Sequence, residues 1–183
     1  MNRQLSRELT VFGLLLAFGV LGRWAQPDWN FTPLAAITAL GGYYFRSLLP
    51  AILLPIGTLA VSDLILPAHD SWPVQLSVHL MMIVPLVLGR QSQGAEGWQA
   101  AFRWGLCGIV PATAFYVVTN FAVWAFTSLY DKTLSGLAAC YVAAIPFYRT
   151  MLAGDIFYIV LLGGCLAIAR MSAQSRALAA NRV

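Results

Sequence analysis

The chain has 183 residues, of which 60% are hydrophobic and only 10% are charged, and its mean hydropathy is +0.73. This composition excludes an ordinary soluble domain of this size and indicates that the lipid bilayer is the solvent. The net charge of +4 includes no basic cluster outside the helix flanks, which excludes a nucleic-acid partner.

Apolar runs separated by proline, glycine and polar residues predict six transmembrane helices. In chain order they cover about residues 9–23, 33–45, 48–66, 73–89, 98–127 and 150–171. The segment 134–146 is rich in small apolar residues and predicts a packed re-entrant or interfacial outer loop. The sequence therefore predicts an all-α integral membrane protein in which residues 1–183 form a single transmembrane domain.

The first apolar run follows Arg3 and Arg7, as the apolar part of a signal peptide would. No small-x-small cleavage site follows this run, and Arg23 with Trp24 resembles an interfacial anchor. We therefore expect a helix that stays in the protein.

Cationic side chains gather at one set of helix ends, where cytoplasmic loops hold an excess of Lys and Arg. These residues are Arg3, Arg7, Arg46, Arg90, Arg103, Arg170, Arg176 and Arg182. The opposite ends hold Arg23, Lys132 and Arg149. This asymmetry predicts that both termini are cytoplasmic.

Most acidic residues and both histidines fall on the predicted outer side. They are Asp28, Asp63, Asp70, Asp131, Asp155, His69 and His79. Ionisable groups at membrane depth usually face a cavity or a partner, so Asp63 and Asp155 are candidates for substrate binding. Helix capping or a salt bridge, for example between Asp155 and Arg149, is the structural alternative.

The predicted fifth helix carries Tyr116, Asn120 and Trp124 at i, i+4 and i+8, which places them in one stripe. Stacked aromatic rings beside an amide suit a flat heterocycle in a pocket. An interhelical hydrogen bond with aromatic packing explains the same stripe without a ligand.

Two outer connections are rich in aromatic and polar residues, PDWNFTP at 27–33 and HDSW at 69–72. Asn30 and His69 can line the rim of an outer pocket with the neighbouring tryptophans. An aromatic belt at the membrane surface, and an N-cap and turn before Pro33, are the structural alternatives.

A metal held in an organic ring needs only one axial ligand from a protein. His79, His69 and Cys140 are therefore rival candidates to bind a corrinoid cobalt, although a lone intramembrane histidine is usually hydrogen-bonded to a neighbour. The three cysteines form no C-x-x-C pair and indicate no structural disulfide.

The chain contains no H-E-x-x-H, G-x-S-x-G, Walker A or G-x-G-x-x-G motif. We therefore expect no catalytic residues, no intrinsic cofactor and no ATP hydrolysis by this chain. Gly13 and Ala17 have the small-x-x-x-small spacing that permits close helix approach, either within the bundle or to a partner.

Four segments resemble a known family: PDWNFTPLAAITALGGYYF, SDLILP with a following histidine, TNFAVWAF, and CYVAAIPFYRTMLAGDIFY. Over about residues 25–165 they are similar to the S components of energy-coupling-factor (ECF) vitamin transporters of bacterial inner membranes, in particular the solitary cobalamin type. The resemblance implies a six-helix bundle that binds a water-soluble vitamin, cobalamin first, from the extracytoplasmic side.

The same resemblance implies a possible coupling protein with ATPases as partner, docked on the first helix at Gly13 and Ala17. It places the pocket near Asp63, His69, Tyr116, Asn120, Tyr141 and Arg149. The solitary cobalamin type is expected to use a cysteine on cobalt, but no cysteine of this chain lies in the third or fourth predicted helix. That departure favours His79 as a substitute ligand.

Two rival functions belong to other classes. A membrane enzyme acting on a lipid or quinone would use Asp63, His69 and Asp155 as acid and base groups. A structural or assembly subunit would turn the stripe from Tyr116 to Trp124 against protein and leave no cavity.

Overall fold

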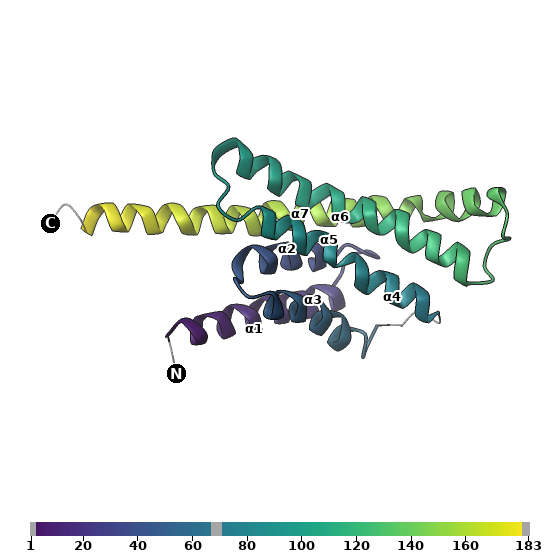
Figure 1. The fold of residues 1–183 in the computed structure, drawn as a ribbon, viewed down its shortest axis with the longest axis horizontal. Helices are drawn as coiled ribbons and strands as arrows, with labels where there is room; N and C mark the ends of the chain where they lie inside the picture. The colour runs from purple at the N-terminus through teal and green to yellow at the C-terminus, as the bar shows by residue number, and fades with distance from the viewer. Residues whose placement is uncertain (1–2, 67–70, 181–183) are drawn as a thin grey trace.

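The computed structural model describes residues 3–66 and 71–180, which contain seven helices and no strand (Figure 1). The helices are α1 (Arg3–Trp24), α2 (Leu34–Tyr44), α3 (Leu48–Ser62), α4 (Trp72–Met81), α5 (Ile83–Gln91), α6 (Gly97–Phe126) and α7 (Leu134–Ala180). The all-α prediction is confirmed for the described part of the chain.

Four helical segments are long and apolar enough to cross a membrane: Arg3–Trp24, Trp72–Gln91, Gly97–Phe126 and Leu134–Ala169. Two further apolar helices, α2 and α3, are shorter. The protein therefore has the helices of an integral membrane protein.

The segment 134–146 is not the predicted loop, because α7 is continuous from Leu134 to Ala180 and includes the predicted sixth helix. This segment packs against α6: the Tyr141 hydroxyl donates to the Val117 carbonyl oxygen at 2.6 Å. Contacts with α6 thus stabilise a helix that the small-residue composition alone did not indicate. Figure 1 shows α7 extending beyond all other helices at the end of the molecule where both termini lie.

The predicted fourth helix is divided into α4 and α5 at Met82. Pro85 has no backbone N–H to donate to the Met81 carbonyl, and the Met82 amide bonds to His79 at i−3 instead. Proline therefore explains the interruption.

Helix α2 is the centre of the bundle and contacts α1, α3, α5, α6 and α7. Glycines allow α2 and α5 to meet backbone to backbone. A Cβ added at Gly89 would lie 1.9 Å from the Ala39 carbonyl oxygen, and one at Gly42 would lie 2.2 Å from that of Leu86. Small residues at such contacts are the usual means of close packing in membrane bundles.

Candidate ligand-binding cavity

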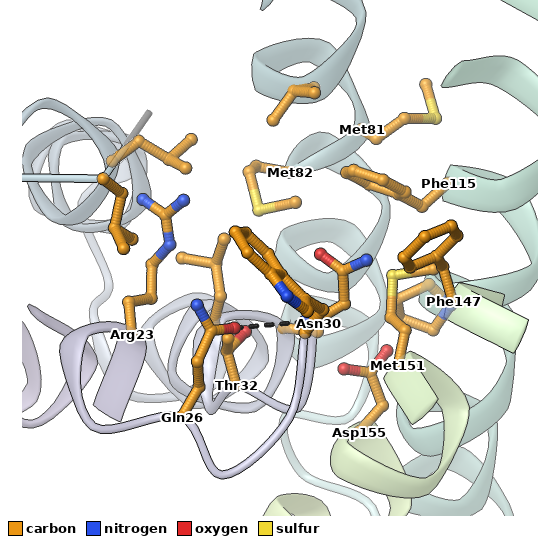
Figure 2. A pocket seen from close by; sticks show the side chains of 17 residues that line it. Arg23, Gln26, Asn30, Thr32, Met81, Met82, Phe115, Phe147, Met151 and Asp155 are labelled. Atoms are coloured by element: carbon orange, nitrogen blue, oxygen red, sulfur yellow. Dashed lines mark hydrogen bonds between the residues drawn. The ribbon is translucent and has the colours of Figure 1, made fainter. Parts of the chain in front are cut away.

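A cavity of about 260 Å³ lies where the C-terminal end of α1 and the N-terminal end of α2 meet α4, α6 and α7 (Figure 2). Its polar lining residues are Arg23, Gln26, Asn30, Thr32 and Asp155. Its larger apolar lining residues are Trp29, Met81, Met82, Phe115, Phe147 and Met151. A concave site with mostly apolar walls and a few convergent polar groups is the usual form of a small-molecule site.

The connection 25–33 between α1 and α2 covers one side of this cavity. Asn30 has a φ of 67°, a left-handed conformation that asparagine adopts more readily than most residues. Its backbone N–H donates to the Gln26 side-chain oxygen at 3.0 Å, which holds the turn (Figure 2). The turn is also packed closely on α7, because a Cβ at Gly154 would lie 3.1 Å from the Phe31 Cα.

Among the described residues Asp155 is the one acidic residue that lines the cavity, and only 4% of its surface is exposed. Its carboxylate points into the cavity (Figure 2). Within the described residues its carboxylate accepts a hydrogen bond from the backbone of Ala112 on α6. The predicted alternative, a salt bridge with Arg149, is not formed, since Arg149 is exposed on α7.

Asp63 does not line the cavity and instead forms a salt bridge with Arg23, which is the structural alternative to substrate binding. The Arg23 Nη1 atom is 2.7 Å from Asp63 Oδ1, and it also donates to the Ser62 hydroxyl. Gln75 donates to the other Asp63 oxygen at 3.2 Å. This cluster joins the C-terminal ends of α1 and α3 to the N-terminal end of α4 and neutralises the guanidinium at the cavity wall.

A second cavity of about 170 Å³ adjoins the first and shares Asn30, Val78, Phe115, Phe147 and Met151 with it. Beyond that shared wall it is lined by Tyr116, Thr119, Asn120 and Tyr148, among other residues. Two members of the predicted stripe, Tyr116 and Asn120, therefore do reach a hollow space.

The same stripe also holds α6 against α7. The Tyr116 hydroxyl donates to the Tyr141 carbonyl oxygen at 2.8 Å, and Asn120 donates to the Tyr116 carbonyl of its own helix. Trp124 lies in neither cavity lining; its indole N–H donates to the Asp131 carbonyl oxygen in the α6–α7 turn. Tyr141 likewise packs on α6 and lines neither cavity.

Of the three candidate cobalt ligands, neither His79 nor Cys140 lines either cavity. The His79 Nδ1 atom lies 2.8 Å from the Gln75 carbonyl oxygen of its own helix, and Cys140 is buried with its thiol on the Asn120 carbonyl. His69 lies outside the described residues. Among residues 3–66 and 71–180 no group of three or more His, Cys, Asp and Glu side chains is placed to hold a metal ion.

The predicted docking pair lies on the outside of the bundle. Gly13 and Ala17 are both exposed on α1, and a Cβ at Gly13 would meet nothing within 4 Å. Gly22, further along α1, instead packs against Pro33.

Sequence reasoning missed several residues that line the main cavity, although a helical spacing in α7 could have revealed some of them. Phe147, Met151 and Asp155 stand at i, i+4 and i+8 on α7 and all line the main cavity. The prediction of a loop over 134–146 concealed this face, because the helix was expected to begin only at about residue 150.

No curated protein and no solved structure matches the chain. One protein-family model does match, and it covers residues 3–178, nearly the whole length. The chain belongs to the family of unknown function DUF6580.

Proposed function

We propose that this protein is a bacterial inner-membrane substrate-binding protein that takes a small water-soluble molecule from the extracytoplasmic side for uptake. The observation that carries the proposal is the cavity of about 260 Å³, into which the buried Asp155 carboxylate projects below the turn at Asn30. A buried ionisable group at membrane depth is costly and is usually retained where it faces a ligand or a path for one. The proposed role is binding and delivery, without chemical conversion of the ligand.

In the proposed topology α2 and α3 are two short spans beside the four long ones, which gives six spans with both termini cytoplasmic. Arginines at the end of the bundle that carries the N-terminus support this orientation. Arg90 donates to the Arg46 carbonyl oxygen at 2.7 Å, and Arg103 donates to that of Gln91. Arg90 lies in the last turn of α5 and Arg103 near the start of α6, on either side of a connection where the proposed topology expects cytoplasmic positive charge.

For the substrate we propose a vitamin-sized molecule within the class that the ECF resemblance suggests. A corrinoid is much larger than a typical ligand of a cavity this size, so the dimensions favour a vitamin smaller than cobalamin. An ECF coupling protein with ATPases would supply the energy for uptake. The alternative is that the protein works alone, without such a partner. The exposed face of α1 at Gly13 and Ala17 is the proposed docking surface.

Native mass spectrometry of detergent-extracted protein tests the proposal, together with thermal stabilisation by a panel of water-soluble vitamins. The matched variants are Phe115→Ala, which alters the cavity wall, and Phe121→Ala, which removes an exposed ring from the same helix. We expect a retained mass or a stabilising vitamin for the wild type and Phe121→Ala, and loss of that signal for Phe115→Ala. A wild-type protein with neither signal would contradict the proposal, and conversion of the bound molecule would indicate an enzyme.

A further inference from the structure

The two charged residues that line the main cavity differ in how their charges are compensated. The Arg23 guanidinium is paired with Asp63, whose carboxylate lies outside the cavity. Asp155 has no such partner: the salt bridge of Arg23 with Asp63 is the one formed within the described part of the chain. The cavity therefore has an excess of negative charge when Asp155 is ionised, and a cation bound beside it would stabilise that buried charge.

The walls around this carboxylate suit an organic cation rather than a hydrated metal ion. Phe115, Phe147 and Trp29 contribute aromatic rings to the same cavity, and three methionines contribute polarisable thioethers. Aromatic faces attract organic cations, most strongly where water is excluded. Among the described residues no three His, Cys, Asp or Glu side chains come together at this site to hold a metal ion.

The first turn of α2 contributes a smaller charge of opposite sign. Leu34 and Ala35 line the cavity, and a helix N-terminus is equivalent to roughly half a positive charge. A partial charge of this size does not cancel the full negative charge of an ionised Asp155. The balance in the cavity still favours a cation.

We propose that the ligand of this cavity is a flat, singly charged organic cation of about one aromatic ring, with Asp155 as its counterion. This inference rests on the proposed binding function and specifies its substrate class. The second cavity, lined by Asn30, Tyr116 and Asn120, would accept a neutral polar substituent of the same ligand.

Three probes of the same size test the charge: the ring-methylated cation N-methylnicotinamidium, neutral meta-toluamide and anionic meta-toluate. Their dissociation constants are measured by calorimetry on the full chain in detergent micelles. For the wild type we expect the cation to bind about tenfold to hundredfold more tightly than the neutral probe, and the anion to bind most weakly.

Asp155→Asn keeps the shape of the side chain and removes its charge. Asp131→Asn makes the same change on an exposed residue outside both cavities. We expect the cation preference to disappear in Asp155→Asn, with binding of meta-toluamide retained, and to persist in Asp131→Asn.

Equal binding of cation and neutral probe by the wild type, or tighter binding of the anion, would overturn the cation assignment while leaving a working cavity. The comparison in the wild type does not depend on the folding of any variant. If none of the probes binds, the cation assignment also fails, and the retained mass in the Phe115→Ala experiment decides separately whether the cavity binds a ligand. A cation preference that survives in Asp155→Asn would overturn the role of that carboxylate.

Discussion

The contact between α2 and α5 provides the sharpest test of the packing, through the substitution Gly89→Ala. The added methyl group would lie 1.9 Å from the Ala39 carbonyl oxygen, whereas carbon and carbonyl oxygen normally approach to about 3.3 Å. The helices must therefore separate by roughly 1 Å or more, because the obstacle is backbone and has no rotamer to change. Met82, at the start of α5, lines the cavity and would move with it.

Overpacking of this kind typically costs about 1–3 kcal/mol, and the obstacle here justifies the upper part of that range. The better helix propensity of alanine returns up to about 1 kcal/mol, so the net loss is about 2 kcal/mol. For a chain of this length such a loss lowers the midpoint of thermal unfolding by roughly 4–8 °C. The unfolding midpoint in detergent, followed by tryptophan fluorescence, measures this change.

Gly13→Ala is the matched control, because its added methyl group meets nothing within 4 Å and the substitution gains the same helix propensity. We expect its midpoint to equal or exceed that of the wild type. A Gly89→Ala protein as stable as Gly13→Ala would refute the close backbone contact between α2 and α5.

Two further predictions concern the cavity rim. Asn30→Gly should leave the unfolding midpoint nearly unchanged. Asn30→Ala should lower the free energy of unfolding by about 1–2 kcal/mol, because alanine is strained at a φ of 67°. Equal midpoints for the two variants would contradict the left-handed turn. Arg23→Met should destabilise the protein by about 1–3 kcal/mol, because it leaves the half-buried Asp63 carboxylate unpaired, and Arg23→Met with Asp63→Leu should recover much of the loss. Additive losses in this double-mutant cycle, measured by denaturation in detergent, would show that the two residues do not interact.

Hydrophobic runs predicted the positions of most helices, because a span needs about 20 consecutive apolar residues and such runs can be identified in the sequence. The helix predicted over 98–127 corresponds closely to α6 at Gly97–Phe126. The segment 134–146 was mistaken because its small residues suit both a re-entrant loop and a close helix–helix contact. Hydrogen bonds of Tyr141 and Cys140 with α6, made between distant parts of the chain, favour the helix, and composition does not show them.

The site was predicted in part for a similar reason. Asp155, Asn30, Tyr116 and Asn120 were selected as polar groups in an apolar chain, and all four line a cavity. Asp63 was selected by the same argument, but its charge is neutralised by Arg23. Polarity at membrane depth indicates that a partner is needed, and it does not say whether that partner is a ligand or another side chain.

The hollow itself follows from the length of α2. Its 11 residues span only about 16 Å, roughly half the hydrocarbon thickness of a bilayer, while the adjacent α6 has 30 residues. Below Leu34 the small residues of α2 let its neighbours close tightly around it, and Ala36, Ile37 and Ala39 are almost completely buried. Beyond Leu34 the centre of the bundle holds no helix, and the turn at Asn30 covers the remaining space. The polar residues can face this space because the central helix α2 does not extend between them. The shortness of α2 is therefore the structural cause of the candidate binding site.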